Sequence, residues 1–158
     1  MSTDSGLEIL LVEDNPHDAE MALRAFQKSR IANRVRHLED GAQALDFLFA
    51  TGAYADRKSA PHPRLVLLDL KLPKIDGLEV LKRLKSDPRT RVVPVVVMTS
   101  SREERDIVES YKLGVNSYIV KPVDFEKFLH AVEQLGLYWL LLNESPPAVP
   151  ETGPGPGP

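Results

Sequence analysis

The feature that most constrains this fold is a repeated alternation of short apolar runs with longer amphipathic stretches. The apolar runs are Leu7–Val12, Val35–Leu38, Leu65–Asp69, Val92–Met98 and Ser117–Val120. Short runs that are almost continuously apolar are typical of strands covered on both faces of a sheet. We therefore expect five buried strands, with one amphipathic stretch following each.

The stretches between and after these runs carry apolar residues at helical spacing. The predicted helices run from Asn15-Pro16 through Phe26, from Gly41 to Thr51, from Asp76-Gly77 to Asp87-Pro88, from Ser101 to Leu113, and from Asp124 to about Leu142. Asn15 and Asp124 are favourable N-cap residues, and Gly114 is a natural stop for the fourth helix. Right-handed crossovers between such strands produce an α/β fold, a doubly wound five-stranded parallel sheet of (βα)5 order.

The domain boundaries follow from composition along the chain. Residues 7–144 are expected to form one domain with an extended C-terminal helix, and residues 1–6 a flexible N-terminus. Residues 145–158 are rich in proline and glycine, and we expect this tail to be disordered. Residues 52–63, GAYADRKSAPHP, form a longer connection than usual between a helix and a strand.

Composition excludes several classes of function. The net charge is −3 and the pI is about 5.8, so no affinity for nucleic acid or for a membrane is expected. The chain has no cysteine, which excludes disulfides and thiolate chemistry. No apolar run approaches the ~20 residues that span a bilayer, and residues 1–8 do not resemble a secretory signal. The chain is therefore expected to be cytoplasmic, and too few residues follow the last helix for a DNA-binding module.

Polar side chains stand at the C-terminal end of four of the predicted strands. Glu13 and Asp14 follow the first strand, Asp69 ends the third, Thr99 follows the fourth and Lys121 follows the fifth. Parallel strands bring these ends to one edge of the sheet, where such folds bind ligands. Carboxylates brought together there repel each other unless a cation lies between them, and Mg²⁺ prefers oxygen ligands. Thr99 and Lys121 add the hydroxyl and the positive charge that stabilise a transferring phosphoryl group.

Each of these residues alone has an ordinary structural explanation. An acidic pair after a strand commonly caps a helix, a threonine there does the same, and a lysine is usually solvated. Their joint occurrence at four strand ends is much harder to reach by chance. An aspartate carboxylate is also a known covalent phosphoryl acceptor, which makes Asp69 the leading candidate.

Four stretches together resemble the receiver domain of two-component response regulators. They are ILLVEDN at 9–15, VLLDLKLPKIDGLEVLKRLK at 66–85, VPVVVMTSS at 93–101 and GVNSYIVKPV at 114–123. The resemblance covers about Leu7 to Leu135. It implies a flavodoxin-like receiver fold and a stand-alone regulator that is phosphorylated by a histidine kinase.

The resemblance also assigns roles at the strand ends. Asp69 resembles the phosphoacceptor. The expected Mg²⁺ ligands are the side chains of Glu13, Asp14 and Asp69 and the backbone carbonyl of Lys71.

Two further residues resemble the switch of these domains. Thr99 is similar to the hydroxyl that moves toward the phosphoryl group, and Lys121 to the lysine that pairs with it. Tyr118 is similar to the aromatic residue that then turns inward, although an aromatic residue in a strand is usually part of the core. The implied output surface is the face formed by the predicted helix Ser101–Leu113, the strand Ser117–Val120 and the helix that starts at Asp124.

The end of the last predicted helix, LGLYWLLL at 135–142, is apolar on almost every side. A helix at the edge of a small domain should keep a polar face. This end either folds back over the sheet edge or the 52–63 connection, or it is buried in a homodimer through Leu135, Tyr138, Trp139 and Leu142. The extended helix and the long connection resemble single-domain regulators paired with bacterial phytochrome histidine kinases.

Two other functions compete with a phosphorylation switch. One is a receiver-like interaction scaffold that works without phosphorylation, which the intact set of strand-end residues disfavours. The other is an aspartyl-phosphate hydrolase, whose second acid two residues after the nucleophile is here Lys71. The prediction from sequence is a signalling protein that is not an enzyme acting on other substrates.

Overall fold

The computed structural model describes residues 7–28, 34–99, 109, 112–115, 117–121 and 124–136. Strands and helices alternate along this part of the chain. The strands are β1 (Leu7–Val12), β2 (Arg34–Leu38), β3 (Leu65–Asp69), β4 (Val95–Thr99) and β5 (Ser117–Val120). The helices are α1 (Pro16–Lys28), α2 (Gly41–Phe49), α3 (Gly77–Ser86) and α5 (Phe125–Gly136), with a 3-10 helix, η2 (Gly52–Arg57), after α2.

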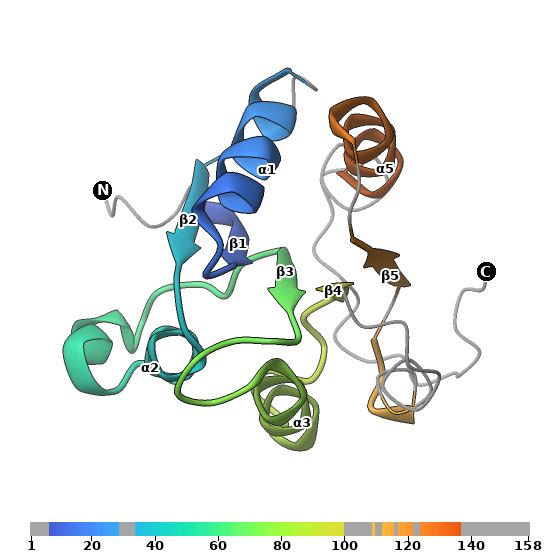
Figure 1. Ribbon diagram of the computed structural model, residues 1–158. Coiled ribbons are helices and arrows are strands. Elements are labelled where there is room, and N and C mark those ends of the chain that lie inside the picture. Colours follow the sequence, from blue (N-terminus) through green and yellow to red (C-terminus); the bar gives the residue numbers. More distant parts are fainter. Residues whose placement is uncertain are drawn as a thin grey trace.

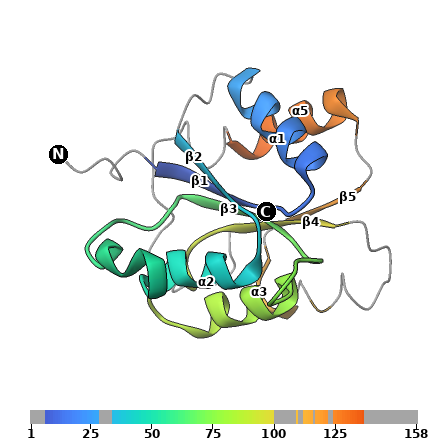
Figure 2. The same ribbon diagram turned by 60° about the vertical axis from the view of Figure 1, so that its left-hand side comes forward.

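The strands form one parallel sheet in the order β2-β1-β3-β4-β5. The chain therefore starts inside the sheet, moves to one edge, and returns past β1 to the other edge. Helices α1 and α5 lie side by side on one face, and α2 and α3 cover the other (Figures 1 and 2). The predicted doubly wound five-stranded α/β fold is confirmed.

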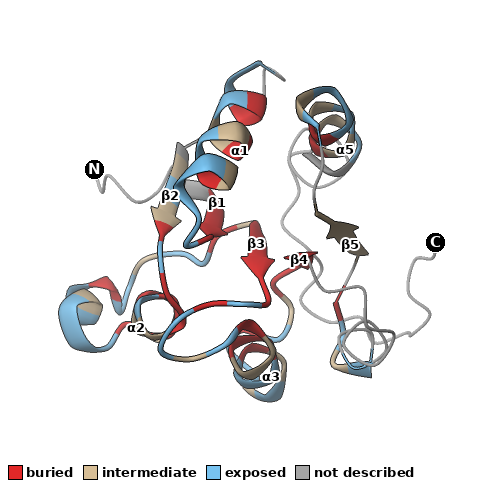
Figure 3. Cartoon of the chain, in the orientation of Figure 1, coloured by how far each residue is buried: buried red, intermediate tan, exposed pale blue. Residues whose placement is uncertain are grey.

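The core has two halves, one on each face of the sheet. Leu10, Val12 and Leu68 pack toward α2 and α3, whereas Ile9 and Leu11 pack toward α1 and α5. Consecutive residues of a strand point to opposite faces, so a nearly continuous apolar sequence fills both halves. Figure 3 shows this burial concentrated in the central strands.

The prediction of five buried strands is wrong for the two outer ones. β5 is half-buried along its whole length, and in β2 Arg36 is exposed while Val35 and His37 are half-buried. Both strands lie at edges of the sheet, where one side of each strand has no neighbouring strand within the described sheet. The central strands β3 and β4 are buried throughout, as expected.

The fourth strand starts later than predicted, at Val95 instead of Val92. Thr90 and Val93 belong to a turn, in which Val93 N donates to Thr90 O at 3.0 Å. Pro94 has no N–H to donate, but its carbonyl accepts a hydrogen bond from Val66 N at 2.9 Å. The apolar run therefore crosses the strand boundary, and Thr99 becomes the last residue of the strand.

Acidic or amide side chains cap the starts of α1, α2, α3 and α5 by accepting a backbone N–H from the first turn. The pairs are Asn15 with Asp18 at 3.0 Å, Asp40 with Gln43 at 2.7 Å, Asp76 with Glu79 at 3.1 Å and Asp124 with Lys127 at 2.8 Å. The predicted caps at Asn15 and Asp124 are confirmed. The second helix ends at Phe49, two residues before the predicted Thr51, because Ala50 adopts a left-handed conformation with φ 57°.

The 52–63 connection begins with η2 and is held by the buried side chain of Arg57. The Arg57 guanidinium lies 3.6 Å from the centroid of the Phe47 ring and donates to the carbonyls of Phe47 and Pro61. The Tyr54 ring meets Phe47 edge-on at 5.2 Å. This connection is thus a packed extension of α2.

Several predictions fall outside the described residues. They concern both terminal segments, most of the helix predicted at Ser101–Leu113, and the helix end beyond Gly136. Near the end of that fourth helix, Glu109 and Lys112 are helical, and Gly114 has φ 102°, in keeping with the predicted stop. Among the helices that the structure describes, none is long and apolar enough to cross a membrane.

Candidate functional site

The strand register brings the predicted residues to one edge of the sheet. Val12, the last residue of β1, pairs with Leu68, so Glu13 and Asp14 emerge beside Asp69. Thr99, the last residue of β4, pairs with Val120, so Lys121 follows at the same edge. The predicted convergence of these strand ends is therefore observed.

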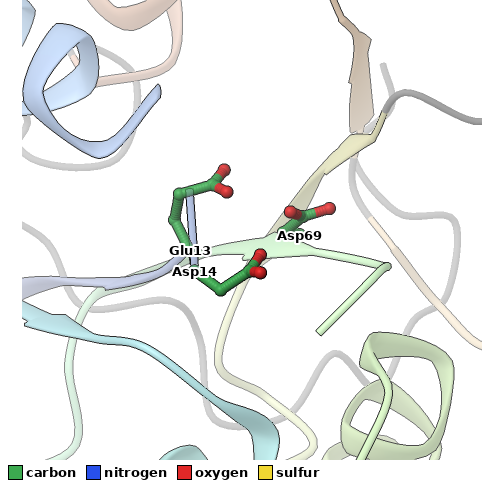
Figure 4. A group of neighbouring side chains, drawn as sticks. All are labelled: Glu13, Asp14 and Asp69. Atoms are coloured by element: carbon green, nitrogen blue, oxygen red, sulfur yellow. The ribbon is translucent and has the colours of Figure 1, made fainter. Parts of the chain in front are cut away.

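The carboxylates of Glu13, Asp14 and Asp69 form a tight group. One oxygen from each lies within 4.8 Å of the other two, and within the described ranges no other group of acidic or histidine residues has this geometry. Glu13 is fully buried and Asp69 is 4% exposed, whereas Asp14 faces solvent. Figure 4 shows the three side chains gathered where β1 and β3 end. Oxygen ligands of this kind suit a hard divalent cation, and the exposed Asp14 leaves a path from solvent.

Burial is the main influence on Glu13. Burial and the nearby charge of Asp69 raise the pKa of this carboxyl, Lys121 and the Asn15 N–H lower it, and the net result is a rise from 4.5 to about 7. Glu13 Oε2 accepts the backbone N–H of Asn15 at 3.0 Å. Its Oε1 is buried and lies 2.9 Å from Lys121 Nζ, an ion pair with no aligned hydrogen bond from the described residues. A buried carboxylate with one oxygen that lacks an aligned hydrogen bond is a suitable ligand for a cation.

Lys121 lies at the centre of the carboxylates. Its Nζ is 2.9 Å from Glu13 Oε1, 2.9 Å from Asp18 Oδ2 and 3.2 Å from Asp69 Oδ2. Burial alone would lower the pKa of Lys121, but the contacts with the Glu13 and Asp18 carboxylates and the charge of Asp69 outweigh it and raise the pKa above its ordinary value. The ammonium therefore stays charged at any physiological pH.

Asp69 is held by two donors from different parts of the chain. Its Oδ1 accepts the backbone N–H of Lys71 at 3.1 Å, and its Oδ2 accepts from Lys121. Thr99 is fully buried next to this edge, and its carbonyl accepts the Lys121 N–H at 2.7 Å. Tyr118 is half-buried in β5, opposite Val97.

Sequence reasoning missed two residues that contact this group. Asp18, in the first turn of α1, pairs with Lys121. His37, near the end of β2, places its Nε2 2.8 Å from the carbonyl oxygen of Glu13. The only signal in the sequence was position, since His37 lies one residue before the end of the β2 run and Asp18 follows Asp14 by one helical turn.

The predicted dimer residues Tyr138, Trp139 and Leu142 lie outside the described residues, as does the side chain of Leu135.

A buried aspartate at a strand end, near two further acids and a lysine, is the arrangement that the resemblance to receiver domains predicts. Residues 9–133 match the response regulator receiver domain family. The chain belongs to this family. The receiver domain accounts for most of the chain and makes it a signalling protein of the two-component type.

Two curated relatives align with the receiver domain over most of their own length. The probable methanogenesis regulatory protein FilR2 of Methanothrix harundinacea is 44% identical over 138 residues, which covers 87% of this chain and 86% of the relative. Response regulator Rcp1 of Synechocystis is 39% identical over 132 residues, which covers 84% of this chain and 88% of the relative.

Three solved structures are similar to this receiver domain. The bacteriophytochrome response regulator AtBRR is 54% identical with a TM-score of 0.71, over 87% of this chain and 99% of its own. A Mn²⁺-bound form of Rcp1 is 38% identical with a TM-score of 0.78, and the phosphorylated cyanobacterial phytochrome response regulator RcpA is 40% identical with a TM-score of 0.79. Each of these two covers 89% of this chain and 99% of its own.

Proposed function

We propose that this receiver domain accepts a phosphoryl group on Asp69 from a histidine kinase, in a reaction that depends on Mg²⁺. The observation that carries the proposal is the position of the Asp69 carboxylate. It is buried at a strand end, lies 3.2 Å from the Lys121 ammonium, and shares a group of three carboxylates suited to a divalent cation. The phosphorylated form of RcpA, a related regulator, supports this assignment.

The residues that would hold Mg²⁺ are the side chains of Glu13, Asp14 and Asp69 and the backbone carbonyl of Lys71. The Mn²⁺-bound form of Rcp1 supports a divalent cation in this family. When bound, Mg²⁺ would neutralise charge on the phosphoryl oxygens and on the acidic group.

The side chains at the site have different roles in the transfer. An oxygen of the Asp69 carboxylate attacks the phosphorus of a phosphohistidine, while the bond from phosphorus to the imidazole nitrogen breaks and the nitrogen keeps the electron pair. The Lys71 N–H orients the carboxylate through its contact with Oδ1. Lys121 lies close enough to pair with a phosphoryl oxygen, and the buried Thr99 would donate its hydroxyl to another.

The output of phosphorylation would pass through Thr99 and Tyr118. A Thr99 side chain drawn toward the phosphoryl group vacates space that the half-buried Tyr118 can fill. The face formed by the helix predicted at Ser101–Leu113, β5 and α5 would then shift between two arrangements. By this packing change, the charge that the phosphoryl group adds would alter the binding surface of the domain.

The kinase partner is proposed to be a bacterial phytochrome. The similarity to the bacteriophytochrome response regulator AtBRR and to RcpA supports this choice. We further propose a homodimer through Leu135, Tyr138, Trp139 and Leu142. Replacing Trp139 and Leu142 by serine should give a monomer by light scattering, and an unchanged mass would refute the dimer.

Intact mass spectrometry tests the phosphorylation directly. The wild type incubated with Mg²⁺ and acetyl phosphate should gain the mass of one phosphoryl group. Asp69→Asn should gain none, and neither should the wild type in excess chelator. Absence of any adduct on the wild type under these conditions would overturn the proposed function.

A further inference from the structure

Asp18 contacts Lys121 as closely as the predicted metal ligand Glu13 does. Its Oδ2 lies 2.9 Å from Lys121 Nζ, the same separation as Glu13 Oε1. The backbone of Asp18 is fixed in the first turn of α1, where its N–H donates to Asn15 Oδ1 at 3.0 Å. The carboxylate is 25% exposed and the lysine side chain 12%, so the pair is largely shielded from water.

The three carboxylates that Lys121 contacts differ in whether they belong to the predicted metal site. An ammonium has three N–H donors, and here each has one carboxylate in reach. Glu13 and Asp69 belong to the group with metal-binding geometry, whereas Asp18 does not. A divalent cation would therefore compete with the ammonium for oxygens of Glu13 and Asp69, but not for those of Asp18.

We propose that Asp18 is a positioning residue that holds the Lys121 ammonium beside Asp69 while a divalent cation occupies the acidic group. This inference rests on the proposed metal site and deepens it. A lysine is a mobile point charge on a long stem, so an anchor on the side away from the metal keeps it near the reacting oxygen. Asp18 is not a catalytic residue, because it acts only through Lys121.

Loss of the Asp18 charge has two effects in the same direction. The ammonium is left with only the metal-binding carboxylates as partners, so it competes more strongly with the cation. One negative charge near the cation also disappears. Asp18→Asn should therefore weaken Mg²⁺ binding about tenfold, a size typical of one charge interaction in a partly shielded site.

A double-mutant cycle with Lys121→Met separates these effects, with Mg²⁺ affinity measured by calorimetry on the full chain. Without the lysine only the loss of charge remains, so Asp18→Asn should then weaken binding by about threefold or less. Equal factors in both backgrounds would show that Asp18 acts as a general charge and would overturn the inference. No change in either background would do the same.

Control variants and a spectroscopic signal complete the test. Glu20→Gln removes an exposed charge from the same helix and should leave the Mg²⁺ affinity within about twofold. Asp18→Glu keeps the charge and should restore most of the affinity. In the wild type, the NMR signal of the Lys121 side-chain ammonium should stay protected from exchange when Mg²⁺ is saturating, and its loss would refute the inference without any variant.

The cycle measures metal binding in the absence of a phosphoryl donor. Failure of the proposed phosphorylation would leave its result unaffected. A failed cycle in a chain that still forms the phosphoryl adduct would refute the role of Asp18 alone.

Discussion

Lys121 Nζ lies 3.2 Å from Asp69 Oδ2, although 52 residues separate the two in the chain. The contact exists because β3 and β5 flank β4 in one parallel sheet and end at the same edge. This contact therefore depends on the register of the sheet. A change that shifts the end of β3 or β5 should alter the surroundings of Asp69.

Lys121→Met should destabilise the metal-free protein, because the fully buried Glu13 and the nearly buried Asp69 lose their shared cation. Removing one partner from a buried ion pair costs about 3 kcal/mol. Mg²⁺ should restore most of this loss, since it supplies positive charge to the same carboxylates. Urea unfolding in chelator and in Mg²⁺ measures both values, and an equal loss in the two conditions would contradict the proposed metal site.

Gly77→Ala should destabilise the fold at the start of α3. A Cβ at this position would lie 2.2 Å from the carbonyl oxygen of Asp69 and 2.5 Å from Leu70 Cα, both backbone atoms. The helix must then move away from the end of β3, at a cost of about 1–3 kcal/mol. Ser86→Ala at the exposed end of the same helix is the control and should change the free energy of unfolding by at most about 0.5 kcal/mol. Equal changes in the free energy of unfolding for the two substitutions would show that the close approach of Gly77 to the backbone of Asp69 and Leu70 does not matter for stability.

Arg57→Lys should destabilise the protein by about 1–3 kcal/mol, because an ammonium cannot stack on Phe47 and also reach the carbonyls of Phe47 and Pro61. Helix α2 starts beside the carboxyl ends of the strands and runs back along the sheet, so η2, which includes Arg57, lies near the ends where the strands begin, away from Asp69 (Figure 2). The yield of phosphoryl adduct on the folded variant should therefore match the wild type. Lys58→Met, at the exposed neighbouring position, should change neither value.

Lys85 should make stability depend on pH in the alkaline range. Its Nζ donates to the carbonyls of Arg91 at 3.0 Å and Val93 at 2.7 Å, and burial lowers the pKa of Lys85 from 10.5 to about 8. Between these two values the unfolded chain holds a proton that the folded chain has released, so stability rises with pH. The gain should be about 1–3 kcal/mol relative to Lys85→Met. Urea unfolding of both proteins across this range measures it, and a constant difference between them would show that the lysine is not desolvated.

Much of the site could be predicted because it depends on where apolar strands end. Asp69 and Thr99 each close a strand, and Glu13 and Lys121 each follow one, so parallel topology alone places them together. Asp18 could not be placed in this way. Its contact with Lys121 depends on how α1 is rotated about its own axis, and an amphipathic pattern fixes that rotation only roughly.

Other details depend on contacts that an apolar pattern does not contain. The run Val92–Met98 predicts a strand, but the first residues of this run belong to a turn at Thr90–Val93. The exposure of β2 and β5 follows from their edge positions, which depend on the order of strands in space. The burial of Arg57 follows from a stack on Phe47, which no charge pattern indicates.

The most direct test of the central claim locates the phosphoryl group in the sequence. Borohydride reduces a phosphorylated aspartate to homoserine, which peptide mass spectrometry identifies by position. After incubation with Mg²⁺ and acetyl phosphate, the wild type should carry homoserine at position 69 and at no other aspartate. Homoserine at Asp14 instead, or an unmodified peptide around Asp69 in protein that carries the adduct, would contradict the account.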